Sequence, residues 1–154
     1  MASASDAPPR AFVDSSVLMA GALSASGSAR DLLLAGLRGE VHLLASPLVL
    51  LETERNLAKK APAGLPAFYE FRALLEDHLV DPSRESVVEV ARHIELKDAP
   101  IVAAAHVARA VYLATYDRRH LLRQADLIRQ LYQIETVTPD VVVATLRPRR
   151  GDAG

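Results

Sequence analysis

The chain has 154 residues, of which 50% are hydrophobic and 24% charged, with no cysteine and a formal net charge of -1. This length fits one globular domain, and the apolar content excludes a mainly disordered chain. The lack of cysteine excludes disulfides, thiolate zinc sites and a cysteine nucleophile, and the near-zero charge excludes a polycation that binds nucleic acid over its whole surface. Any metal must bind to oxygen or histidine, and any nucleic acid to a local patch.

The two ends of the chain differ from its middle. The first nine residues are small, polar and proline-ended, so we expect a disordered N-terminus over 1–9, one domain over 10–147 and a flexible tail over 148–154. The N-terminus lacks the features of a signal peptide, and no later stretch has the roughly 18 uninterrupted apolar residues of a membrane span. We therefore expect a cytoplasmic protein without a membrane partner.

Short apolar runs alternate with longer amphipathic segments along the domain. In chain order, the pattern predicts a strand over 10–13, a helix over 28–39, a strand over 41–45, helices over 46–62, 66–79, 83–94 and 98–109, a strand over 111–115, a helix over 121–132, a strand over 134–137 and a helix over 139–146. Ser28 with Asp31 resembles a capping box, and Ser46 and Ser83 are predicted N-caps. The helix over 98–109 is apolar nearly all round, which is typical of a buried helix.

Strands separated by helices indicate parallel pairing, because parallel strands need crossover connections. We therefore predict an α/β fold, a three-layer α/β/α sandwich with a central parallel sheet. In such sheets, ligands bind beyond the carboxyl ends of the strands.

Carboxylates occupy those positions in this sequence. Asp14 directly follows the first predicted strand, and Asp117 lies two residues past the third. Asp98 begins the buried helix that leads into the third strand, and Glu52 lies near the second turn of the helix after strand two. We expect these four side chains to converge at one edge of the sheet.

Each of these acids also has a purely structural explanation. Asp98 and Asp117 stand at predicted helix starts, where an acidic side chain caps free backbone N–H groups. Asp14 can cap a turn. Glu52 can pair with Arg55 three residues later.

Taken together, the acids favour a cation site. Carboxylates held close together raise one another's pKa, so a cluster persists at neutral pH chiefly when a cation compensates it. Oxygen ligands select hard cations, here Mg²⁺ or Mn²⁺. The five histidines show no ligand spacing, and only His120 lies near the predicted site.

Four motifs in order carry a resemblance to a known family. They are VDSSVL at 13–18, SPLVLLE at 46–52, KDAPIVAAA at 97–105 and TYDRRHLL at 115–122. Together they resemble the PIN domain, the nuclease fold of many toxins of type II toxin–antitoxin systems, which are VapC-like ribonucleases. The likeness extends from about residue 11 to 146.

The resemblance implies a metal-dependent ribonuclease. Asp14, Glu52, Asp98 and Asp117 would be its catalytic and metal-binding residues, with Mg²⁺ or Mn²⁺ as cofactor, and its products would carry 5'-phosphate and 3'-hydroxyl ends. Thr115 matches a hydroxyl that orients the first aspartate in the family, although a threonine is also ordinary in a β-strand.

Two positions depart from the family pattern. Ser16 stands where the family often has asparagine, and its hydroxyl still supports hydrogen bonding. Arg119 stands where many members carry a further acid, which predicts weaker binding of a second metal.

The arginines beside the last acid offer a phosphate-binding patch. Arg118, Arg119 and Arg123 are predicted to contact RNA, and helical spacing aligns Arg119 with Arg123. Solvated surface arginines explain the same residues equally well.

Two other functions stay open. A haloacid-dehalogenase-like phosphatase also has an aspartate after its first strand, but it needs a second aspartate where this chain has Ser16. A non-catalytic PIN-like module that binds RNA or protein without cutting is the alternative to a nuclease.

The helix predicted over 66–79 indicates that the protein binds another protein chain. It carries more apolar side chains than one packed face needs, and such an excess is common at interfaces. These side chains are Phe68, Tyr69, Phe71, Leu74, Leu75 and Leu79. We expect a homodimer, and the same surface fits a segment of an antitoxin protein.

Overall fold

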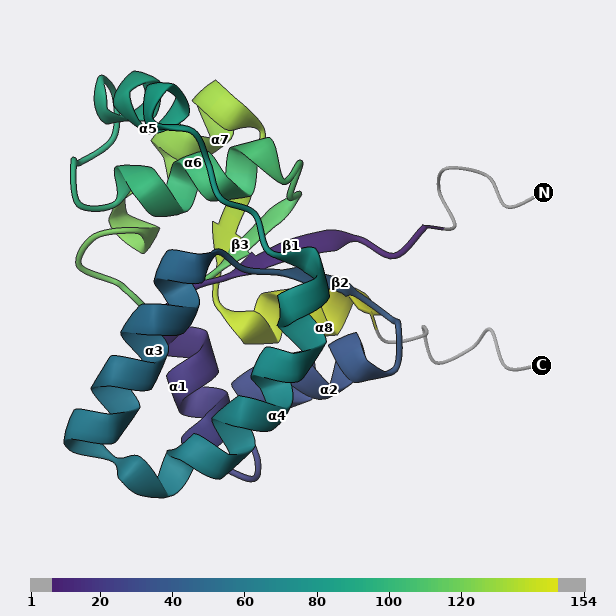
Figure 1. Cartoon of the computed structure of the whole chain (residues 1–154). Helices are drawn as coiled ribbons and strands as arrows, with labels where there is room; N and C mark the ends of the chain where they lie inside the picture. The colour runs from purple at the N-terminus through teal and green to yellow at the C-terminus, as the bar shows by residue number, and fades with distance from the viewer. Residues whose placement is uncertain (1–6, 147–154) are drawn as a thin grey trace, which may run out of the picture.

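A computed structural model describes residues 7–146 of the chain (Figure 1). Residues 1–6 of the predicted N-terminal extension and the predicted tail over 148–154 lie outside the described residues. The elements are β1 (Arg10–Val13), α1 (Ser15–Leu23), α2 (Ser28–Leu37), β2 (His42–Leu44), α3 (Pro47–Lys60), the 3-10 turn η2 (Pro62–Gly64), α4 (Leu65–Leu75), η3 (Glu76–His78), α5 (Arg84–Ala91), α6 (Ala99–Val107), β3 (Tyr112–Ala114), η4 (Leu122–Gln124), α7 (Ala125–Tyr132), β4 (Glu135–Val137) and α8 (Pro139–Leu146).

The centre of the molecule is a four-stranded sheet in the order β2-β1-β3-β4. All pairs are parallel, with Phe12 opposite both Leu44 and Leu113, and Leu113 opposite Thr136. Helices α5, α6 and α7 gather on one side of the sheet, and α1, α2, α4 and α8 on the other (Figure 1). The predicted α/β/α sandwich with a central parallel sheet is confirmed.

Local signals in the sequence explain several helix boundaries. The hydroxyl of Ser46 accepts a hydrogen bond from the backbone N–H of Val49 at 3.3 Å, and Pro47 begins α3. The hydroxyl of Ser83 accepts one from Ser86 N–H at 3.1 Å and caps α5. Both predicted N-caps are therefore confirmed.

The capping box predicted at Ser28 is wrong. Ser28 is the first residue of α2, and Gly27 holds the N-cap position with φ of 105° and no side-chain cap. The backbone N–H of Asp31 donates to the carbonyl of Gly27 at 3.0 Å. A glycine takes this position because a positive φ strains residues that carry a Cβ.

Helix α1 has no counterpart in the sequence prediction. Asp14 is its N-cap and accepts a hydrogen bond from the backbone N–H of Ser15 at 2.7 Å. Two serines and Gly21 weaken its intrinsic helix propensity, so packing against the core forms this helix. A Cβ at Gly21 would clash with the side chain of Leu33, so the glycine permits the close contact of α1 with α2.

The apolar surface of α4 is smaller than predicted. Phe68, Phe71 and Leu75 are buried in the domain's own core and are unavailable to a partner. Tyr69 on α4 stays exposed, at 41%. The helix predicted over 66–79 ends early, because α4 stops at Leu75; Leu79, at 37%, follows η3 in extended conformation and is not part of the helix.

Within residues 7–146, no helix combines the length and the apolar character needed to cross a bilayer.

Candidate active site

Asp14 lies at the carboxyl end of β1, at the start of α1. It is only 6% exposed. Its Oδ1 accepts the N-cap hydrogen bond from Ser15, while its Oδ2 accepts from the hydroxyls of Thr115 at 2.8 Å and Ser16 at 3.2 Å. The turn-capping explanation therefore accounts for one oxygen, and a separate hydroxyl pair orients the other.

Thr115 and Ser16 connect the ends of two neighbouring strands. Thr115 follows β3, is fully buried, and accepts a hydrogen bond from the backbone N–H of Asp117 at 3.0 Å. Ser16 accepts one from the backbone N–H of Tyr116 at 3.0 Å. These hydroxyls set the relative position of Asp14 and the segment that carries Asp117.

Asp98 is 5% exposed and occupies the N-cap position of α6 without capping it. Its Oδ2 accepts a hydrogen bond from Gln124 Nε2 at 3.0 Å, and Lys97 Nζ lies 3.9 Å from its Oδ1. Burial raises the pKa of the Asp98 carboxyl, and the hydrogen bond from Gln124 opposes this shift. Helix capping does not explain this buried acid.

Asp117 lies in the loop after β3. Its Oδ1 accepts a hydrogen bond from the backbone N–H of His120 at 3.1 Å. Residues 118–121 form turns. Asp117 therefore caps a turn, and not the start of a helix as its structural explanation from the sequence assumed.

Glu52 projects from α3 and is partly buried. Within the described part of the chain it makes no ion pair, and the predicted pairing with Arg55 is absent; its neighbour Glu54 pairs with Arg72 instead, at 2.7 Å. Burial raises the pKa of Glu52, and the carboxylate of Asp14 raises it further. Glu52 therefore faces the other acids.

One open pocket of about 360 Å³ joins all four acids. Its lining comprises Asp14, Ser15, Ser16, Glu52, Lys97, Asp98, Ile101, Asp117 and Leu121. The four carboxylates supply only oxygen donors, and among residues 7–146 Lys97 is the one basic side chain in the lining. This donor set fits a hard divalent cation, because Mg²⁺ and Mn²⁺ bind carboxylate oxygens and water.

A tighter group of possible ligands lies at the edge of this pocket. Ligand atoms of Glu95, Asp98 and His120 all lie within 4.8 Å of one another. No three of the four predicted acids come this close in residues 7–146. Neither Glu95 nor Gln124 was predicted from the sequence, because their contacts join segments 26 to 29 positions apart and no local spacing reveals them.

The three arginines lie outside the pocket lining. Arg118 and Arg119 stand in the turn after Asp117, and Arg123 lies in η4; all three are exposed. The predicted helical alignment of Arg119 with Arg123 is wrong, because α7 begins only at Ala125. None of the three forms an ion pair with any residue between 7 and 146.

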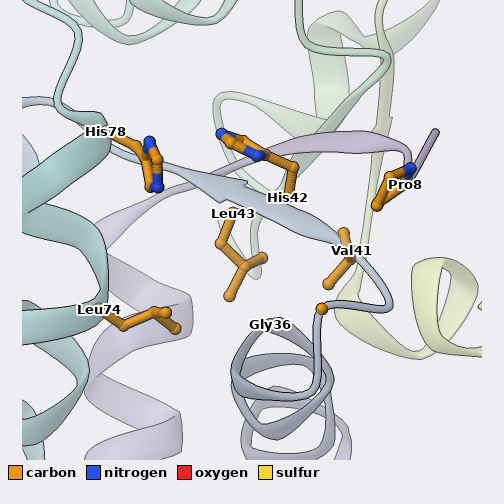
Figure 2. Close-up of a pocket in the computed structure, with 8 residues that line it drawn as sticks. Pro8, Gly36, Val41, His42, Leu43, Leu74 and His78 are labelled. Atoms are coloured by element: carbon orange, nitrogen blue, oxygen red, sulfur yellow. The ribbon is translucent and has the colours of Figure 1, made fainter.

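A second pocket, of about 130 Å³, lies beside strand β2 (Figure 2). His42 and His78 face each other there, with ring centroids 4.5 Å apart, above Leu43 and Leu74. Burial lowers the pKa of His42, and the nearby His78 lowers it further. The described lining contains no carboxylate, so this pocket is separate from the acidic one.

Comparisons with known proteins agree with this architecture. The sequence model of the PIN domain matches residues 11–127, which is more than half of the chain. No curated protein matches the chain in sequence. Among solved structures, the crystal structure of PAE2754 from Pyrobaculum aerophilum aligns with a TM-score of 0.63 at 21% identity, over 90% of this chain and 95% of that chain. At this identity, the likeness shows a shared fold.

Proposed function

The chain belongs to the PIN domain family, and we propose that it is a Mg²⁺- or Mn²⁺-dependent endoribonuclease that hydrolyses phosphodiester bonds in RNA. PIN domains are generally metal-dependent nucleases, and RNA is the substrate that we propose for this one. The observation that carries the proposal is the lining of one open pocket by Asp14, Glu52, Asp98 and Asp117.

We propose that Asp14, Asp98 and Asp117 hold the cation, directly or through water. A bound divalent cation would neutralise the pocket, make a water more acidic and stabilise the negative charge that develops on the phosphorane and the leaving oxygen. Thr115 and Ser16 fix the Oδ2 oxygen of Asp14, so this ligand is oriented before a cation binds.

We propose that Glu52, which lines the pocket beside the three proposed ligands, acts as the base that deprotonates the attacking water. In the metal-free protein, burial and the carboxylate of Asp14 raise the pKa of Glu52. Lys97 lines the same pocket and offers a positive charge to a substrate phosphate. The exposed Arg118, Arg119 and Arg123 extend the basic surface beyond Asp117.

We also propose that the protein acts in the cytoplasm as the toxin of a toxin–antitoxin pair, and that it forms a homodimer. Exposed apolar side chains on α3 and α4 support an assembly face: Leu48 at 39%, Leu51 at 46% and Tyr69 at 41%. Light scattering at micromolar concentration should give twice the mass of one chain, and a single-chain mass contradicts the dimer.

The ribonuclease proposal is tested by incubation of single-stranded RNA with the purified protein. We expect cleavage with Mg²⁺ or Mn²⁺, none with EDTA, and products with 5'-phosphate and 3'-hydroxyl ends. RNA that is bound but stays intact at every metal concentration supports the alternative, a non-catalytic module that binds RNA or protein.

A further inference from the structure

The segment before α6 and the loop after β3 bring together three side chains that commonly bind transition metals. Glu95 and Asp98 belong to the turn before α6, and His120 belongs to the turn after Asp117. Their ligand atoms lie within 4.8 Å of one another, and His120 Nδ1 lies 3.4 Å from Glu95 Oε2. Ligands of one metal ion are separated by comparable distances, since each lies about 2.0–2.2 Å from the ion.

We propose that Glu95, Asp98 and His120 form a second metal site, which binds Zn²⁺ in preference to Mg²⁺. The histidine nitrogen is the reason for this preference, because imidazole suits zinc and its neighbours in the first transition row, whereas Mg²⁺ takes oxygen ligands. The site goes beyond the proposed nuclease function and shares only Asp98 with the acidic pocket.

Gln124 holds all three ligand residues in place. Its Oε1 accepts a hydrogen bond from the backbone N–H of Glu95 at 3.0 Å. Its Nε2 donates to Asp98 Oδ2 at 3.0 Å and to the backbone carbonyl of His120 at 3.1 Å. A single side chain thus joins two segments about 25 residues apart, as outer partners do in metal sites.

The burial of Asp98 is a second indication. This carboxylate is 5% exposed and stands at the N-cap position of α6, yet it makes no capping bond. Its Oδ2 accepts a hydrogen bond from Gln124, and its Oδ1 lies 3.9 Å from Lys97 Nζ, which is long for an ion pair. Buried carboxylates are paired with a cation or bind a metal, and a metal ion would complement the weak pairing of Asp98.

The contact between Glu95 and His120 does not by itself explain the cluster. Both side chains are substantially exposed, at 52% and 37%, and exposed polar contacts of this kind contribute little to stability. The contact also leaves out Asp98, which is the buried member of the group. A metal ion would engage all three residues.

Calorimetric titration of the full chain with ZnCl₂ and with MgCl₂ tests the site. His120→Gln and Glu95→Gln should each weaken Zn²⁺ binding by at least about tenfold. Loss of a residue that only supports a ligand already weakens metal affinity by about 10- to 100-fold, so loss of a ligand should cost no less. Mg²⁺ binding should persist in both variants. Asp14→Asn should give the reverse, with Mg²⁺ binding lost and Zn²⁺ binding kept.

His78→Gln is the matched control, because His78 and His42 are another histidine pair that can attract zinc (Figure 2). This variant should bind Zn²⁺ as the wild type does. Imidazole resonances of His120 in NMR spectra should shift on addition of one equivalent of Zn²⁺, which reports ligation without any measurement of activity.

The outcomes separate the two proposals. Loss of Zn²⁺ affinity in His78→Gln, or unchanged affinity in both His120→Gln and Glu95→Gln, overturns the second site. If Mg²⁺ fails to bind the wild type while Zn²⁺ binding depends on His120, the nuclease site fails and the second site stands. Loss of both metals in both His120→Gln and Asp14→Asn shows one shared site and contradicts the inference.

Discussion

The hydroxyl of Thr115 donates a hydrogen bond of 2.8 Å to Asp14 Oδ2, between residues 101 positions apart in the sequence. The contact joins the ends of β1 and β3, which are neighbours in the sheet. Thr115 also accepts a hydrogen bond from the backbone N–H of Asp117. One buried hydroxyl therefore fixes the relative placement of two of the four acids.

We predict that Thr115→Val lowers the free energy of unfolding by about 1–3 kcal/mol, because it leaves buried polar partners unsatisfied. Urea denaturation measures the change. Thr136→Val is the matched control, because Thr136 is also buried and its Oγ1 has no hydrogen-bond partner in residues 7–146. The control should be neutral or stabilising, and an equal loss in both variants argues against a special role for Thr115.

The raised pKa of Glu52 predicts a pH-dependent stability in the metal-free protein. Above the ordinary glutamate pKa of about 4.3, the unfolded chain releases this proton more readily than the folded chain. The contribution of Glu52 to stability therefore falls as pH rises through the window between its ordinary and its raised pKa.

Glu52→Gln should remove this effect. In EDTA, we expect the variant to be more stable than wild type at neutral pH, with the difference vanishing below a pH of about 4. Glu70→Gln, on an exposed position of α4, provides the baseline in the same urea titrations. Equal or lower stability of Glu52→Gln at neutral pH contradicts the crowding of charge in the pocket.

Gln124→Leu should weaken Mg²⁺ binding by about 10- to 100-fold, because Gln124 holds Asp98 in place from outside the ligand set. The same change should also weaken Zn²⁺ binding at the inferred second site. Gln130→Leu, at an exposed position of α7, is the control and should bind both metals normally. Calorimetry that finds wild-type affinities in Gln124→Leu removes its positioning role.

Substrate binding can be tested apart from cleavage in an Asp14→Asn background. Arg119→Ala together with Arg123→Ala should weaken binding of single-stranded RNA and reduce the slope of log affinity against log salt by about 1.4, or 0.7 for each lost phosphate contact. The control pair, Arg38→Ala with Arg92→Ala, removes the same charge elsewhere on the surface and should leave the slope unchanged.

An unchanged salt slope in the Arg119 and Arg123 double variant means that RNA contacts another surface. The next candidates are then Arg147, Arg149 and Arg150, which lie outside the described residues.

The parts of the site that were predictable follow from the regularity of a parallel sheet. Asp14 and Asp117 follow strands, so their convergence could be inferred from the alternation of strands and helices alone. Asp98 and Glu52 were reached in the same way, through the helices next to those strands. The four strands were also predictable, because each lies in a short segment rich in apolar or β-branched residues between two helical patterns.

Features that depend on distant contacts could not be inferred. Helix α1 lacks a strong periodic signal, and its glycine is explained only by the nearby side chain of Leu33. Gln124 contacts Glu95 and Asp98 across the fold. The arginines were predicted to lie on a helix, but that helix begins later in the chain. The backbone N–H of Leu122 donates to the carbonyl of Asp117, and the residues between them form turns.

The most direct test of the nuclease proposal compares wild type and Asp14→Asn, purified side by side, on a 5'-labelled single-stranded RNA with Mn²⁺. Asparagine keeps the shape of the side chain but removes the charge that would hold the cation. We predict metal-dependent cleavage by the wild type and none by a variant with an unchanged circular dichroism spectrum. Equal cleavage by both proteins would contradict a role for Asp14, and with it the acidic pocket as the active site.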